Sequence, residues 1–332
     1  MDIDLTAPLP WHIAHWQSLM ARHRAAILPH ALLLSGSRGL GKGVFARALA
    51  KALFCESPQE DGTACGQCRS CQQFEAGSLP DYKHVHPLEG KSVIAIDQCR
   101  ELSDFLSLTS HYGRYRIVIL EPAEQMNVAA ANSLLKTLEE PPQGSLLILV
   151  SSQPDSLLPT IRSRCQQIVF QPPDRTEAGQ WLRGRLDDPQ QVDLLLSLAC
   201  NAPLLALEMA QGNQLALRQG MLKDLEQLAA GRVDVSAIAA HWADSGVQEV
   251  ITWLQTWFTD MIRLKSADSP PLLSNPDIQP RLQQLAEAVN WETLYGLLDR
   301  LNEMTRRLQG SLNTQLMLED FLISWTRGLK SQ

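Results

Sequence analysis

The first half of the chain alternates between short apolar runs and amphipathic stretches. Residues 44–54 carry apolar side chains at helical spacing. Four runs have the length and apolar content of buried strands, at residues 31–35, 116–120, 145–150 and 168–170. Short apolar runs separated by helical patterns are typical of a parallel sheet covered on both faces. The pattern therefore predicts an α/β domain over residues 1–170.

A different pattern begins after Pro172 and Pro173. Proline lacks a backbone N–H and keeps its predecessor out of the helical region, so this pair predicts a boundary. Beyond it, apolar residues at helical spacing predict short helices over 176–186 and 190–200. From about residue 215 the pattern is nearly all helical. We expect a small helical domain over 171–212 and a larger all-α domain over 213–332.

Composition narrows the class of protein. The chain has 332 residues, 45% of them hydrophobic, which is enough to bury a core without disulfide support. No stretch approaches the roughly 18–20 consecutive apolar residues of a membrane span. The first twelve residues lack the basic segment of a secretory signal. We therefore expect a soluble, cytoplasmic protein.

Charge disfavours a protein that binds nucleic acid unaided. The net charge is −7, from 29 basic and 36 acidic residues. Residues 1–170 hold 15 basic and 16 acidic side chains, and 171–212 and 213–332 each carry a net charge of −3. Proteins that hold DNA by themselves usually carry a basic excess, because phosphate neutralisation dominates their affinity. This charge balance argues against a protein that binds DNA on its own, including the zinc-ribbon DNA-binding protein that the clustered cysteines described below would otherwise suggest.

A G-x-x-x-x-G-K loop lies between the first predicted strand and the first predicted helix. Its glycines, Gly36, Gly39 and Gly41, let backbone N–H groups converge on phosphate oxygens, and Lys42 would reach the β- and γ-phosphates. The next residue is Gly43, where the motif needs a Ser or Thr hydroxyl for Mg²⁺. The loop predicts a P-loop fold, and a phosphate-binding relic fits it at least as well as a working site. Whether it still holds ATP stays open.

The second predicted strand carries an independent defect. A P-loop ATPase ends this strand with an Asp for Mg²⁺, usually followed by a Glu that positions water. Here the strand ends in Glu121 and Pro122, and proline has no group that could act as a base. Glu124 lies three residues beyond Glu121 and is expected to be a solvated carboxylate. The two defects together argue against ATP hydrolysis by this chain.

Four of the seven cysteines lie within seventeen residues, at Cys55, Cys65, Cys68 and Cys71. Two overlapping C-x-x-C steps with a fourth thiol nearby suit a tetrahedral zinc ion. An iron–sulfur cluster is the main alternative, because short cysteine spacings also hold those clusters. Four thiolates leave no open coordination position, so the predicted role of the zinc is structural.

A short Ser-Arg-Cys segment, residues 163–165, lies near the last predicted strands. An arginine at such a place could reach the γ-phosphate of a neighbouring subunit. From the three residues by themselves, an ordinary surface role for Arg164 is preferred.

Taken together, these residues resemble the clamp-loader branch of the AAA+ superfamily. The matching parts are residues 30–33 running into the P-loop, the four-cysteine insert after the P-loop helix, and segments 130–142 and 158–165. A segment near the end is similar to the closing helix of the family's oligomerisation collar, with Asn313, Gln315, Leu316, Leu318 and Glu319. The resemblance implies a RecA-like AAA+ domain with a zinc module at 55–71, then a helical lid and a helical collar.

The four-cysteine insert looks bacterial, which implies a component of the DNA polymerase III holoenzyme, a DNA-directed DNA polymerase. The gamma/tau ATPase of that assembly has a Thr after the P-loop Lys and an Asp-Glu pair at the second strand. This chain departs at both places, with Gly43 and Pro122. It therefore resembles the branch's non-hydrolysing member and is expected to have no ATPase activity of its own. A gamma/tau-like ATPase with an atypical active site is the alternative.

The resemblance also implies partners and a role for one arginine. Arg164 maps onto the arginine finger that completes the ATP site of an adjacent gamma/tau subunit. The implied partners are the gamma/tau and delta subunits in a five-subunit ring. Through that ring the chain would help to load a sliding clamp on primer–template DNA.

Overall fold

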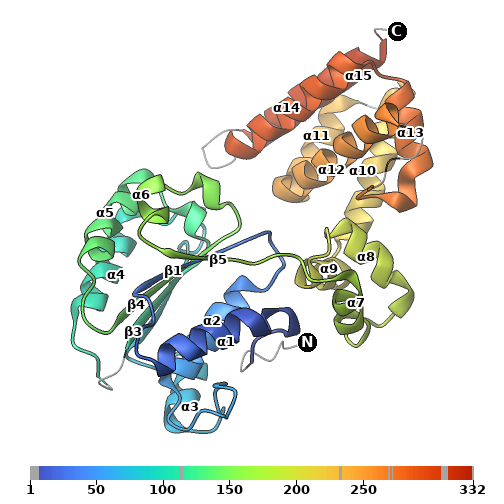
Figure 1. The fold of residues 1–332 in the computed structure, drawn as a ribbon. Coiled ribbons are helices and arrows are strands. Elements are labelled where there is room, and N and C mark those ends of the chain that lie inside the picture. The colour runs from blue at the N-terminus through green and yellow to red at the C-terminus, as the bar shows by residue number, and fades with distance from the viewer. Residues whose placement is uncertain are drawn as a thin grey trace. The chain divides into compact units, whose positions relative to one another are not determined.

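The chain forms two compact units, residues 1–173 and 174–332 (Figure 1). The computed structural model describes residues 7–111, 115–231, 234–267, 270, 272–307 and 313–330. The first unit contains a parallel β-sheet with helices, and the described part of the second is helical. This is the predicted fold class, an α/β domain followed by an all-helical remainder. The division of that remainder into a lid and a collar at residue 213 stays a prediction.

The sheet has five parallel strands in the order β2-β3-β4-β1-β5. Every residue of β1, β3 and β4 is buried, which explains why these strands read as continuous apolar runs. The strands are β1 (Ala31–Ser35), β2 (Tyr82–Val85), β3 (Arg116–Leu120), β4 (Ser145–Ser151) and β5 (Gln166–Val169).

Three predicted strands are confirmed almost to the residue, and the outer strands differ. The fourth run was expected at 168–170, whereas β5 begins at Gln166 and ends before Phe170. Strand β2 was not predicted, because Tyr-Lys-His-Val has only moderate apolar content and its residues are half-buried or exposed at the edge of the sheet. It pairs in parallel with β3, with Tyr82 opposite Ile117 and Val85 opposite Leu120.

Helices cover both faces of the sheet (Figure 1). A continuous apolar core joins one face to α4 and α5, including Leu33, Val118, Leu149, Leu102 and Leu134. Helix α2 packs against β1, β3 and β4 from the other face. The helices of this unit are α1 (Ile13–Arg24), α2 (Lys42–Phe54), α3 (Arg69–Glu75), α4 (Ile96–Ser107), α5 (Val128–Glu139) and the single turn α6 (Pro159–Arg162).

The second unit is built from helices whose buried faces carry large aromatic side chains. Val250, Trp253, Leu254 and Trp257 lie at helical spacing and are all buried. The helices are α7 (Arg175–Arg183), α8 (Val192–Leu198), α9 (Pro203–Gln211), α10 (Gln214–Ala229), α11 (Val235–Asp244), α12 (Val247–Ser266), α13 (Gln279–Glu287), α14 (Trp291–Arg307) and α15 (Thr314–Lys330).

None of the described helices, taken singly, is long and apolar enough to cross a membrane. Segments 189–198 and 203–211 reach that length and apolar content only when they are taken together. The chain bends by 117° between them.

Candidate functional site

The P-loop connects the end of β1 to the start of α2, as its sequence context predicts. Gly36, Gly39 and Gly41 have φ values of 141°, 80° and 84°, which side chains other than glycine rarely adopt. A β-carbon at Gly36 would also overlap the carbonyl oxygen of Phe170, which follows β5. Backbone conformation and close approach therefore both require glycine at the start of this loop.

Lys42, the lysine of the motif, turns back onto its own loop. Its Nζ donates to the carbonyl oxygens of Gly36 at 2.6 Å and Ser37 at 2.8 Å, and to the hydroxyl of Ser152 at 3.1 Å. These three acceptors match the three N–H donors of an ammonium group. Burial lowers the pKa of Lys42 to about 8, against the opposing influence of Glu124 and Glu121.

The carboxylate of Glu121 lies where the motif expects a hydroxyl-bearing side chain. A β-carbon built on Gly43 would overlap both carboxylate oxygens of Glu121, at the end of β3. The nearest basic group is His84, whose Nε2 is 3.6 Å from Glu121 Oε2. The two sequence defects, at residues 43 and 121, are therefore a single structural feature.

Glu124 is not the freely solvated carboxylate that its sequence position suggested. It is half-buried, and its Oε1 accepts a hydrogen bond of 3.0 Å from the backbone N–H of Ser152. Ser152 follows β4 directly, and β4 is the neighbour of β1 in the sheet. Sequence reasoning missed Ser152 as the partner of Lys42 and Glu124, and only the strand order points to it.

A short N-terminal segment, η1 (Pro10–His12), braces the P-loop from outside. Trp11 Nε1 donates to the Leu40 carbonyl oxygen at 3.0 Å, and His12 Nε2 lies 2.8 Å from the same oxygen. Because a carbonyl only accepts, His12 carries its proton on Nε2. The His12 ring is buried edge-on against Phe45 and Phe170, and burial lowers its pKa to about 4. Neither contact has a local sequence signal.

The four clustered cysteines lie together between α2 and α3. Their Sγ atoms are all within 4.8 Å of one another. Zinc–sulfur bonds of 2.3 Å in a tetrahedron place sulfur atoms about 3.8 Å apart, so a small adjustment brings the four thiols to that geometry. Cys55 caps the C-terminus of α2, Cys68 precedes α3, and Cys71 lies in its first turn. The donor set therefore fits a metal ion held by four thiolates.

Backbone N–H groups point at the sulfur atoms of this cluster. The N–H of Cys65 donates to Cys55 Sγ at 3.2 Å, and that of Cys68 donates to Cys65 Sγ at 3.4 Å. Hydrogen bonds from the N–H groups of Gln67 and Cys68 lower the pKa of Cys65 to about 6. Burial instead raises the pKa of Cys55 and Cys71. A bound cation would compensate the charge of the two buried thiolates.

The cysteine module is tied to helix α1 by contacts outside the thiol cluster. Trp16 Nε1 donates to the Asp61 carbonyl oxygen at 3.1 Å, and Arg24 donates to that of Glu60 at 2.7 Å. Gly62, with φ of 85°, lies so close to Met20 that a β-carbon would crowd its side chain. The module is thus a fixed part of the first unit.

Arg164 lies just after the single turn of α6. Its guanidinium donates to Glu139 Oε1 at 2.6 Å and to the Thr160 carbonyl oxygen at 3.0 Å. The side chains of Arg164 and Glu139 are 34% and 50% exposed. The arginine therefore remains accessible from solvent, while Cys165 beside it is buried in the core.

Two family models match the chain. One, described as DNA polymerase III, delta subunit, matches residues 11–174, and its C-terminal counterpart matches residues 212–327. The DNA polymerase III subunit delta' of Pseudomonas aeruginosa is 34% identical over 95% of this chain and 96% of its own length. The chain belongs to the DNA polymerase III delta' family. The predicted resemblance to the clamp-loader branch is confirmed at this level.

Other relatives differ in how much of their own length this chain covers. The delta' subunit of Escherichia coli K12 is 30% identical over 95% of this chain and 94% of its own length. The tau subunit of Bacillus subtilis is 25% identical over 87% of this chain but only 56% of its own length. The chain therefore matches delta' relatives end to end and a tau relative over part of that protein.

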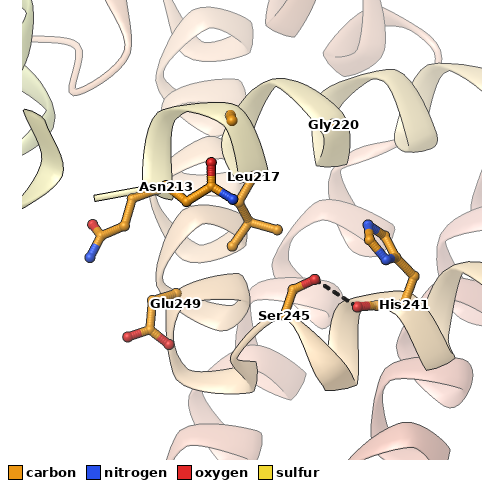
Figure 2. A pocket seen from close by; sticks show the side chains of 8 residues that line it. Asn213, Leu217, Gly220, His241, Ser245 and Glu249 are labelled. Carbon is orange, nitrogen blue, oxygen red and sulfur yellow. Dashed lines mark hydrogen bonds between the residues drawn. The ribbon is translucent and has the colours of Figure 1, made fainter. Parts of the chain in front are cut away.

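In this delta' family member, a pocket in the second unit lies apart from the sequence motifs. Figure 2 shows it between the start of α10 and the turn from α11 to α12. It has a volume of about 460 Å³, and His241 and Glu249 are its titratable lining residues. Ser245 donates its hydroxyl hydrogen to the His241 carbonyl at 2.8 Å, which closes the end of α11 (Figure 2). That bond gives the Ser245 hydroxyl a structural role.

Proposed function

We propose that this chain is the delta' subunit of a DNA polymerase III clamp loader and acts there as a non-hydrolysing stator. The observation that carries the proposal is the Glu121 carboxylate packed on Gly43. That arrangement removes the hydroxyl ligand and fills the space beside it, so metal-assisted phosphoryl transfer loses a required part. Lys42, bonded to its own loop, supports the same conclusion. A cytoplasmic location stays a prediction.

The second part of the proposal is that Arg164 serves a neighbouring subunit. An exposed ion pair contributes only about 0–1 kcal/mol, so Glu139 would release the guanidinium at small cost. A free guanidinium on a surface turn suits stabilisation of a phosphate on another subunit. The partners are then gamma/tau and delta subunits in a five-subunit ring, which loads the sliding clamp on primer–template DNA.

Steady-state ATP hydrolysis by the purified chain tests the stator role. We expect no turnover above that of a Lys42→Ala variant, together with co-purification of the chain with gamma/tau and delta subunits. Turnover that Lys42→Ala abolishes would instead support the alternative, a gamma/tau-like ATPase with an atypical active site.

We further propose that the four thiols of Cys55, Cys65, Cys68 and Cys71 hold a structural zinc ion. We expect one zinc per chain in freshly purified protein, and loss of that zinc with a lower melting temperature in Cys68→Ser. Cys200→Ser is the matched control, because Cys200 is exposed and lies in the second unit. Elemental analysis that finds iron, or much less than one zinc per chain, contradicts the assignment.

A further inference from the structure

Glu121 emerges from the sheet on the side that faces α2. Side chains alternate along strands, and Val118 and Leu120 belong to the core under α4 and α5. Ile117, Ile119 and then Glu121 therefore point to the opposite face, where α2 lies. The parallel register places Tyr82 and His84 of β2 on that same face, beside Ile117 and Ile119.

The carboxylate thus lies over the first turn of α2, directly against Gly43. In a P-loop site, the hydroxyl at this position and the acid of the second strand hold the magnesium ion between them. Here the glutamate is one methylene longer than an aspartate, and the position facing it has no side chain. The longer acid and the missing side chain compensate each other. The Glu121 carboxylate therefore fills the space that a Ser or Thr side chain would occupy at position 43.

The polar groups around Glu121 are incompletely paired. Arg47 Nε, Tyr82 Oη and His84 Nε2 are buried atoms without a hydrogen-bond partner in the described part of the chain. Arg47 is one helical turn beyond Gly43, and therefore on the same side of α2. The Glu121 carboxylate therefore shares this face of the sheet with Tyr82 and His84, and His84 Nε2 lies 3.6 Å from Glu121 Oε2.

We propose that Glu121 is a carboxylate plug that keeps magnesium–nucleotide out of the P-loop, with Gly43 as the residue that makes room for it. The inference rests on the proposed function, in which the chain hydrolyses no ATP, and it names the group responsible. The carboxylate would repel the negative charge of a phosphate that enters the loop, and it fills the space beside Gly43 where the motif's hydroxyl-bearing side chain would lie. The P-loop glycines and Lys42 are retained, and a bound phosphate would replace the loop carbonyl oxygens that accept from Lys42, so removal of the plug should restore access.

Calorimetric titration of the full-length chain with ATP, with and without Mg²⁺, tests the plug. We expect Glu121→Ala to bind Mg·ATP at least about tenfold more tightly than the unmodified chain, equivalent to about 1.4 kcal/mol. Glu121→Gln keeps the size but not the charge, and we expect a smaller gain of about threefold. Glu101→Ala, which removes an exposed charge on α4, leaves affinity unchanged.

Two further variants test the pairing of Gly43 with Glu121. Gly43→Ser by itself should give no gain in affinity and a lower melting temperature, because its β-carbon meets the carboxylate. Gly43→Ser combined with Glu121→Ala should bind ATP more tightly with Mg²⁺ than without it, because the new hydroxyl can hold the metal.

Unchanged affinity in a folded Glu121→Ala or Glu121→Gln variant overturns the plug, and so does wild-type binding as tight as that of Glu121→Ala. Those results concern binding only, and the stator role would survive them. Turnover of ATP by the unmodified chain is the separate result that overturns the proposed function.

Discussion

Among single residues, His12 links the stability of the P-loop region to pH. Burial holds its pKa at about 4, below the ordinary value of 6.5. Between these values the unfolded chain binds a proton that the native chain does not, so the stabilising contribution is complete above pH 6.5 and is lost as the pH falls toward 4. We expect this to lower the free energy of unfolding by about 3 kcal/mol across that interval.

Urea unfolding at several pH values, with His12→Gln for comparison, checks this expectation. Glutamine keeps an N–H donor for the Leu40 carbonyl but does not titrate. The variant should therefore lose stability less steeply between pH 6.5 and 4 than the unmodified chain. Equal pH dependence in the two proteins would show that His12 does not carry the effect.

At the residue scale, the sequence predicted the residues of the P-loop but not the side chains that contact the loop. Gly36, Lys42 and the cysteines follow local spacing rules, which a motif captures. The partners of the loop, such as Trp11, Glu121 and Ser152, come from segments far away along the chain. The positions of Glu121 and Ser152 depend on strand order, because the parallel strands β1, β3 and β4 bring their ends to one edge of the sheet. No local pattern encodes that order.

At the scale of whole elements, a buried arginine ties α10 to the segment before α13. Arg218 makes two hydrogen bonds of 2.7 and 2.8 Å to Asp277 and one of 3.0 Å to Asn275. We expect Arg218→Met to lower the free energy of unfolding by about 3–5 kcal/mol, because it leaves the polar groups that faced the guanidinium without hydrogen-bond partners. Chemical denaturation measures the loss.

Arg300 is the matched control for this prediction. It makes a similarly short bond of 2.6 Å to Asp320 between α14 and α15, but both side chains are largely exposed. Arg300→Met should cost only about 0–1 kcal/mol. Equal losses of unfolding free energy in the two variants would mean that burial does not determine how much these ion pairs stabilise the fold.

Elements were predictable in proportion to how strongly they are buried. The fully buried strands β1, β3 and β4 were found from apolar content, and the edge strand β2 was missed because its residues are mixed. Helix α2 was predicted from residue 44 and begins at Lys42, since the glycine-rich loop hides its first turn. Periodicity reports burial, and it weakens wherever an element meets solvent.

At the scale of the whole molecule, the order of strand and helix patterns along the chain predicted an α/β domain followed by helices. Strand and helix patterns alternate up to Pro173 and give way to helices after it, and the chain divides into two compact units at the same place. The net charge of −7 is compatible with the proposed role, in which the chain would meet DNA only as part of an assembly. The motifs alone could not establish the proposed in-trans role of Arg164, because the ATP site that it would complete belongs to another chain.

We propose that Arg164 completes the ATP site of a neighbouring gamma/tau subunit, while this chain hydrolyses no ATP itself. Steady-state ATP turnover by a complex of gamma/tau, delta and this chain tests it most directly, with Arg162→Ala as control. Arg162 lies two residues away and pairs with exposed Asp155. Arg164→Ala should leave assembly intact and should lower ATP turnover at the site that Arg164 completes by at least about 100-fold. An assembled Arg164→Ala complex that turns over ATP as fast as the Arg162→Ala complex would contradict it.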